Sequence, residues 1–128
     1  MRELKDCSGP WVGFWIQGSQ RGSMRLTLRF WDETVEGEGD DFIGDFTIRG
    51  EYSAVMNEVS FTKTYPTHLV LYKGSWDGAM ISGEWEFSRR MRFVVPRGGF
   101  EIWPEREEES IERQLEVESK PDLQPVGA

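Results

Sequence analysis

The sequence predicts an all-β protein, an antiparallel up-and-down barrel of eight strands. Three features of residues 1–104 lead to this prediction. Apolar and polar residues alternate with period two in several stretches, turn-forming residues separate these stretches, and no helical pattern interrupts them. Period-two alternation is typical of strands with one buried face, and short connections favour antiparallel hairpins. Eight such strands can close into a barrel without exposed edges, whereas a two-sheet β-sandwich is the alternative architecture.

The expected strands follow one another with short gaps. They occupy residues 11–17, 23–31, 33–38, 45–53, 57–64, 67–74, 78–87 and 91–103, the last in one or two pieces. The first strand is apolar on both faces, because Trp11 and Trp15 alternate with Val12, Phe14 and Ile16. An apolar strip on the outside would mark an interaction site, or a face covered by another part of the protein.

Alternation is clearest in the second, fourth, fifth and seventh strands. The residues that share one face in each of these strands are Met24, Leu26, Leu28 and Phe30; Phe46 and Ile48; Val59, Phe61, Lys63 and Tyr65; and Ile81, Gly83, Trp85 and Phe87. Turn signals lie between the strands, and they are Gly18-Ser19, Asp32-Glu33, Gly39-Asp40-Asp41, Met56-Asn57, Tyr65-Pro66, Asp77-Gly78 and Arg97-Gly98-Gly99.

The composition changes near Pro104, which divides the chain into two parts. Residues 9–104 hold all the tryptophans and form the expected barrel domain. Residues 105–128 lack aromatic residues, and eight acidic and three basic residues give them a net charge of −5. Ile111 and Leu115 lie four apart and form a weak apolar stripe, so we expect an acidic tail that is partly helical or disordered.

Charge and cysteine content exclude several classes of function. The net charge of −8 argues against nucleic acid as a partner, because lysine and arginine drive phosphate binding. No apolar run is long enough to cross a bilayer or to act as a secretory signal, so no membrane association is expected and the cytoplasm is the expected compartment. Cys7 is the only cysteine, which rules out an internal disulfide, and we expect a surface thiol in a flexible start.

The start of the first strand, Gly9-Pro10-Trp11, resembles that of the calycin-type barrels, which include lipocalins, fatty-acid-binding proteins and avidins. The repeated Gly50-Glu51-Tyr52 and Gly83-Glu84-Trp85 are similar to avidin strands in which a glycine precedes an aromatic residue. The resemblance implies an eight-stranded barrel that holds a small ligand. It also implies that Trp11 closes one end beneath an arginine of a late strand, either Arg92 or Arg97.

The aromatic residues are the most informative candidates for a site. Large rings fill cores, and barrels also bind small apolar ligands on such rings. We predict a non-enzymatic barrel that binds a small, partly apolar ligand at one mouth. The candidate ligand-binding residues are Trp15, Gln17, Tyr65, His68, Tyr72 and Trp85. The first alternative is a protein-interaction or homo-oligomeric module with a filled core, which uses the apolar first strand or the acidic tail. The second is an enzyme with His68 and Tyr65 as acid–base groups.

Other chemical groups lack the pattern that a catalytic or metal site needs. One histidine and one distant cysteine give no zinc spacing, so no metal or other cofactor is expected. The segment Asp32–Asp41 holds six carboxylates, but it lacks the order of a calcium loop and we interpret it as a solvated hairpin. Glu84 and Glu86 are expected on an outer face. Arg89, Arg90, Arg92 and Arg97 form a basic cluster that could hold the acidic tail.

Overall fold

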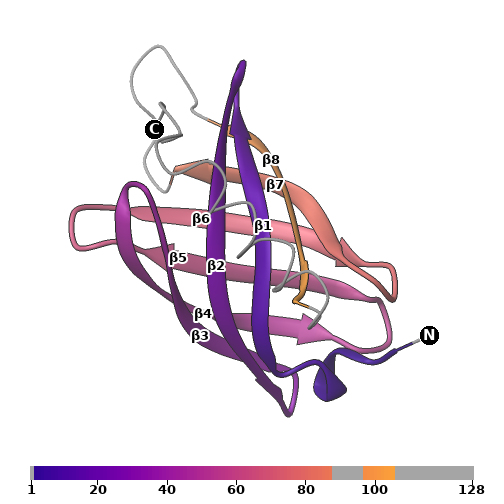
Figure 1. Ribbon diagram of the computed structural model, residues 1–128. Coiled ribbons are helices and arrows are strands. Elements are labelled where there is room, and N and C mark those ends of the chain that lie inside the picture. The colour runs from indigo at the N-terminus through magenta and orange to yellow at the C-terminus, as the bar shows by residue number, and fades with distance from the viewer. Residues whose placement is uncertain (1, 88–96, 106–128) are drawn as a thin grey trace, which may run out of the picture.

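The computed structural model describes residues 2–87 and 97–105, and it shows a closed barrel of eight strands (Figure 1). The strands are β1 (Gly9–Gln17), β2 (Gln20–Trp31), β3 (Thr34–Asp41), β4 (Gly44–Ser53), β5 (Glu58–Thr64), β6 (Leu69–Trp76), β7 (Ile81–Phe87) and β8 (Arg97–Pro104). Each strand pairs antiparallel with the next, and β8 pairs antiparallel with β1. The predicted all-β barrel is therefore confirmed, and the two-sheet sandwich is excluded.

The observed strands differ from the expected ones mainly at their ends. β3 runs to Asp41, three residues beyond the expected end, and the chain turns at Phe42 and Ile43 instead. The Asp41 side chain makes this turn, because its Oδ1 accepts hydrogen bonds from the backbone N–H groups of Ile43 and Gly44. The first part of the eighth expected strand and the acidic tail fall on residues 88–96 and 106–128, outside the described residues.

The period-two pattern determines which side chains enter the barrel. In β2 every second residue from Gly22 to Phe30 is buried, and the residues between them are exposed. The repeated glycines, Gly50 and Gly83, lie in the inward phase of β4 and β7. A Cβ atom at Gly50 would collide with the Ser60 carbonyl oxygen, and one at Gly83 would collide with that of Lys73. The repeat therefore permits close approach of neighbouring strands, a geometric role.

A short 3-10 helix, η1 (Leu4–Asp6), closes one end of the barrel. The indole N–H of Trp11 donates to the Cys7 carbonyl oxygen at 2.8 Å, and that of Trp76 donates to the Arg2 carbonyl oxygen at 2.8 Å. Leu4 and Cys7 are buried in the same hydrophobic core as the rings of Trp11, Phe30, Tyr52 and Trp76, which contact one another. These contacts tie the residues before β1 to the barrel interior, so this end is filled.

Two expectations about this end are wrong. Cys7 is 3% exposed rather than a surface thiol, and its burial raises the pKa of the thiol. Period-two patterning could not show this, because the residues before the first strand fold back under the barrel. Arg97 does not cover Trp11: it pairs with Glu86 at the opposite end of β8, whereas Trp11 pairs with Pro104. Arg92 lies outside the described residues.

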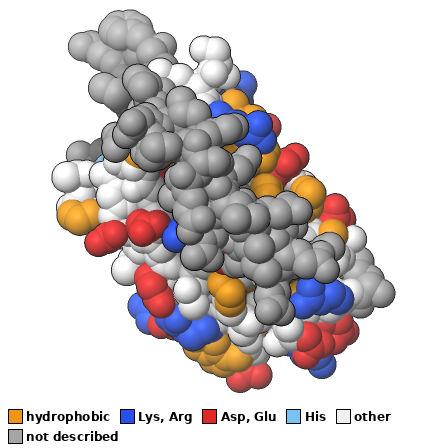
Figure 2. Space-filling model, viewed as in Figure 1, with side chains coloured by type: hydrophobic (Ala, Val, Ile, Leu, Met, Phe, Trp, Pro, Cys, Tyr) orange, Lys and Arg blue, Asp and Glu red, His pale blue; other side chains and the backbone are white. Residues whose placement is uncertain are grey.

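The outer wall of the barrel carries charges of both signs (Figure 2). Glu84 and Glu86 are exposed there, as expected. Phe14 of β1 also faces outward, with the Arg21 guanidinium 3.5 Å from its ring centroid and the Trp103 ring against its edge. In the part of the chain that the structure describes, no helix is long and apolar enough to cross a membrane.

Candidate ligand-binding site

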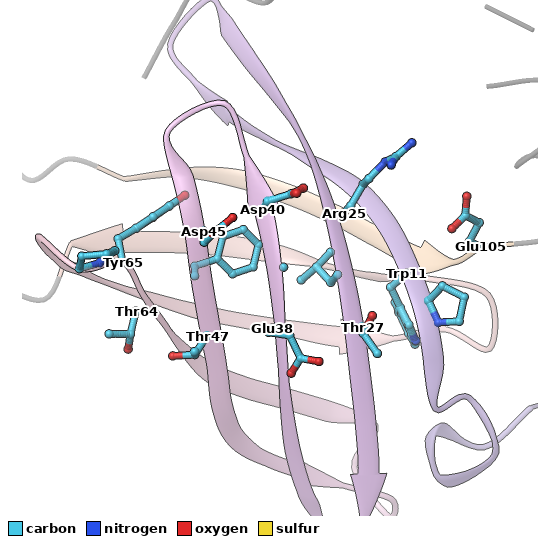
Figure 3. A pocket seen from close by; sticks show the side chains of 15 residues that line it. Trp11, Arg25, Thr27, Glu38, Asp40, Asp45, Thr47, Thr64, Tyr65 and Glu105 are labelled. Carbon is cyan, nitrogen blue, oxygen red and sulfur yellow. The ribbon is translucent and has the colours of Figure 1, made fainter. Parts of the chain in front are cut away.

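A broad hollow of about 810 Å³ lies against the outer wall of β2, β3 and β4 (Figure 3). Its lining includes the charged and polar side chains of Arg25, Glu38, Asp40, Asp45 and Thr47, all on the solvent side of their strands. Small-molecule sites are usually concave and mostly apolar, with few polar groups. Among the described residues, no group of three or more histidine, cysteine or acidic side chains could hold a metal ion. This hollow therefore offers little for a specific ligand.

A second cavity, of about 270 Å³, opens at the end of the barrel opposite η1. It is lined by Trp15, Gln17, Ile43, Tyr65, His68, Val70, Tyr72, Trp85 and Phe87. All six residues predicted from the sequence to bind a ligand are among these nine. The structure thus brings them together at one mouth, and their role in binding stays a prediction. Sequence reasoning missed Ile43, Val70 and Phe87, although Phe87 follows the same alternation as Trp85.

The strand phases explain how the cavity forms. Trp15 and Gln17 lie two apart at the end of β1, and Trp85 and Phe87 lie two apart at the end of β7, so each pair faces inward. The connection between β5 and β6 brings Tyr65 to His68, because the Tyr65 backbone N–H donates to the His68 carbonyl oxygen at 2.9 Å. Antiparallel pairing then places all these strand ends at the same end of the barrel.

Aromatic rings form most of the cavity wall. The His68 ring stacks on Tyr65 with centroids 4.6 Å apart. The His68 and Phe87 rings meet edge to face, with centroids 5.7 Å apart. The ring centroids of Trp85 and Phe87 are 5.6 Å apart. Ring faces of this kind accept planar apolar molecules by offset or edge-to-face contact.

The polar groups of the wall are few. The Trp85 indole N–H donates to the Ile16 carbonyl oxygen at 3.0 Å, and the Thr67 hydroxyl lies 2.8 Å from His68 Nδ1. Trp15 is 3% exposed, and its Nε1 has no hydrogen-bond partner within the described residues. A buried donor without a partner is costly, so Trp15 is an unusual feature of this wall.

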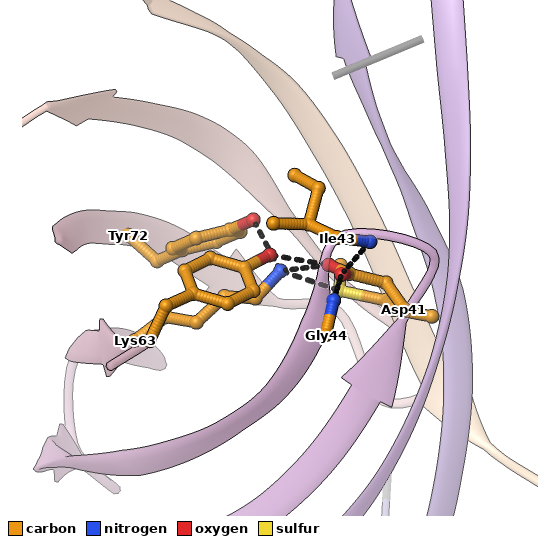
Figure 4. A network of polar contacts seen from close by, with 7 residues as sticks. Asp41, Ile43, Gly44, Lys63 and Tyr72 are labelled. Atoms are coloured by element: carbon orange, nitrogen blue, oxygen red, sulfur yellow. Dashed lines mark hydrogen bonds and ion pairs between the residues drawn. The ribbon is translucent and has the colours of Figure 1, made fainter. Parts of the chain in front are cut away.

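A buried ion pair lies next to Tyr65 and Tyr72 of the cavity wall, and Figure 4 shows its partners Lys63 and Asp41 together with Tyr72. The Lys63 ammonium is 2.8 Å from Asp41 Oδ2, and the two side chains are 1% and 0% exposed. The same Asp41 oxygen accepts a hydrogen bond from the Tyr65 hydroxyl. The ammonium also donates to the Tyr72 hydroxyl oxygen at 3.4 Å. Both tyrosines therefore belong to the cavity wall and to the charged cluster.

Aromatic rings surround the lysine ammonium. The Nζ atom lies 4.3 Å from the Phe46 ring centroid, 5.0 Å from that of Tyr65 and 5.4 Å from that of Tyr72. Such cation–π contacts, together with Asp41, offset part of the cost of burying the charge. Burial lowers the pKa of Lys63, while Asp41 acts in the opposite direction. Burial, followed by the proximity of Asp41, raises the pKa of Tyr65 and of Tyr72, so both hydroxyls keep their protons at neutral pH.

The ion pair was not predicted from the sequence. Asp41 was assigned to a solvated hairpin, which holds for the exposed Glu38 and Asp40 but is wrong for the Asp41 carboxylate. A signal was present in β5, where Lys63 shares the phase of Val59 and Phe61. A lysine on the apolar face of a strand requires a buried partner.

Sequence comparisons add no relative to this picture. No protein-family model matches the chain, and no curated protein matches it significantly.

Proposed function

We propose that this protein binds a small, partly apolar molecule in the open end of its barrel and leaves it chemically unchanged. The observation that carries the proposal is the cavity of about 270 Å³, walled by aromatic rings and placed at one mouth. Its volume lies just below the range of roughly 300–1,000 Å³ that is typical of small-molecule sites. A molecule of one or two rings fits this size.

The closed end supports the same proposal. Trp11, Trp76 and η1 fill that end, so the cavity has its entrance at the other. A first-strand tryptophan packed at the filled end of an eight-stranded barrel also resembles the calycin-type barrels, and we propose a calycin-like protein on this basis. A free cysteine suits a reducing compartment, and we propose the cytoplasm.

The electrostatics favour binding over acid–base catalysis. A general base must lose its proton near the working pH. The pKa of Tyr65 is raised by burial and by Asp41, which holds the hydroxyl proton. This tyrosine is therefore a poor base at neutral pH, and its hydroxyl instead fixes the shape of the cavity wall.

The test is a methyl NMR titration of the full chain with naphthalene, indole and coumarin as probes. Ile43 and Val70 line the cavity, whereas Ile81 and Val59 lie in the filled part of the barrel and serve as internal controls. We expect saturable shifts of the Ile43 and Val70 methyl signals, with those of Ile81 and Val59 unchanged. A folded protein whose Ile43 and Val70 signals respond to none of the probes would refute the proposal.

A second candidate function is self-association through the outer face of β1. Ile16 is exposed, and the half-buried Phe14 faces outward beside Trp103. Light scattering of the wild type and of Ile16→Gln tests this candidate. A wild type that is monomeric at high concentration would exclude it, and a dimer that dissociates in the variant would support it.

A further inference from the structure

Two buried donors of the cavity wall have no acceptor among the described residues, the Trp15 indole N–H and the Tyr72 hydroxyl. The Tyr65 hydroxyl donates to Asp41, and the Trp85 indole donates to Ile16, so both donors are engaged. Tyr72 differs, because its oxygen accepts from the Lys63 ammonium, which can only donate. Among the described residues, no acceptor receives the Tyr72 hydroxyl proton. Tyr72 lines the cavity and is 3% exposed, so bulk water competes little for this proton.

The ion pair orients this donor. The Lys63 ammonium occupies one lone-pair direction of the Tyr72 oxygen, so the hydroxyl proton must point elsewhere. Asp41 and the Phe46 ring hold the ammonium in place. Lys63 therefore acts on a ligand through Tyr72.

The charge of the cluster restricts the ligand. Lys63 and Asp41 are both buried and neutralise each other, so no unpaired charge faces the cavity from this pair. An ionised ligand would lose its water without gaining a counter-ion, which is unfavourable in an apolar wall. A ligand that packs against the stacked Tyr65 and His68 rings must also be planar.

We infer that the cavity selects uncharged, planar molecules that carry a hydrogen-bond acceptor, a carbonyl oxygen or a ring nitrogen, which receives the proton of the Tyr72 hydroxyl. This inference rests on the proposed binding function and names the ligand class for the same cavity. It assigns the specificity to Tyr72 and a positioning role to Lys63 and Asp41.

Three probes of similar shape separate the requirements. Naphthalene has no acceptor, quinoline replaces one ring carbon by nitrogen, and 2-naphthoate carries a negative charge. Dissociation constants are measured at pH 8 from the Ile43 and Val70 methyl shifts, with the full chain. We expect quinoline to bind about tenfold more tightly than naphthalene, which corresponds to one net hydrogen bond, and 2-naphthoate to bind more weakly than both.

Tyr72→Phe removes the hydroxyl and keeps the ring. In this variant quinoline should bind no better than naphthalene. Tyr52→Phe, which removes a hydroxyl from the filled end of the barrel, is the matched control and should keep the preference for quinoline.

Each outcome is distinguishable. Equal binding of naphthalene and quinoline by the wild type would overturn the acceptor requirement, and tight binding of 2-naphthoate would overturn the requirement for an uncharged ligand. A preference for quinoline that survives in Tyr72→Phe would move the donor to Trp15 or Gln17 and overturn the assignment. Binding of none of the probes would instead refute the proposed function. If Tyr72→Phe does not fold, the wild-type comparison still decides whether the cavity requires an uncharged ligand with an acceptor.

Discussion

Asp41 and Lys63 form an ion pair at 2.8 Å inside the barrel, although β4 lies between the two strands that carry them. The pair therefore connects β3 to β5 across the interior rather than along the sheet. It also joins three parts of the cavity region, because Asp41 contacts Tyr65 and the β3–β4 turn, while Lys63 contacts Tyr72.

Removal of one partner of this pair should destabilise the protein strongly. Lys63→Met leaves the Asp41 carboxylate buried and unpaired, and we expect a loss of about 3–5 kcal/mol in the free energy of unfolding. The measurement is urea denaturation at pH 7. Lys73→Met, on the exposed face of the neighbouring strand β6, is the control and should change stability by less than about 0.5 kcal/mol.

The double variant Lys63→Met/Asp41→Asn isolates the coupling between the two charges. Asparagine keeps a side-chain oxygen for the turn at Ile43 and Gly44 but carries no charge. The double variant should lose less stability than the sum of the two single variants. Strict additivity of the two losses would show that the ion pair contributes no coupling energy.

Stability should fall at high pH because of Tyr65 and Tyr72. Their pKa values are raised in the folded state, so above about pH 10, where an unfolded tyrosine ionises, the folded state retains protons that the unfolded state loses. Their contribution is fully present below that pH and is lost as the pH rises. Lys63 acts in the opposite direction. Its pKa is lowered in the folded state, so its contribution to the free energy of unfolding rises as the pH approaches the ordinary lysine value.

The variant Tyr72→Phe separates these contributions. Above pH 10 its stability should fall less steeply than that of the wild type, by up to about 1.4 kcal/mol per pH unit for one tyrosine. Urea denaturation between pH 8 and pH 11 measures both profiles. They should run parallel below pH 9, and parallel profiles above pH 10 as well would contradict the assignment of Tyr72.

A larger side chain at Val70 should block the cavity. Val70→Phe places a ring in the space of about 270 Å³, and we expect probe affinity to fall at least tenfold while the barrel stays folded. Leu69→Phe is the matched control, because Leu69 precedes Val70 in β6 and faces solvent. The measurement is the quenching of tryptophan fluorescence by the probes. Equal probe affinity in the two variants would place the binding site elsewhere.

Cys7 should react slowly with thiol reagents in the native protein. The thiolate is the reactive form, and burial both shields the sulfur and raises the pKa of the thiol. A disulfide reagent should label native Cys7 at least about 100-fold more slowly than the protein in concentrated urea. Because the chain has a single cysteine, the signal needs no assignment. Similar rates in both states would show that η1 does not close the barrel end.

Much of the candidate site followed from local patterns. Trp15 and Gln17 share a phase, as do Tyr72 and Val70, and hairpins of adjacent strands bring their ends together. These relations depend only on side-chain alternation and short connections, which are properties of neighbouring residues. The six predicted ligand-binding residues therefore meet at one mouth, although their register was not known.

The errors came from relations that local patterns do not contain. Arg97 was expected near Trp11, but β8 runs antiparallel to β1, so its first residue lies at the open end. Cys7 precedes the first strand and carries no alternation, so nothing local indicated that η1 folds under the barrel. Glycine and turn signals near Asp41 suggested that the strand ends before Asp41. In the structure β3 includes Asp41, whose side chain forms the turn that follows.

Alternation and turn chemistry act within a few residues, so the sequence alone predicted the strand number, the antiparallel order and the apolar face of the strands that alternate. Closure of the sheet decided the rest. Only a curved, closed barrel brings Lys63 of β5 to Asp41 of β3, since strands that are not neighbours meet across the interior. The same closure places Tyr65 and Tyr72 between the buried charges and the cavity, and these contacts give the open end its chemistry.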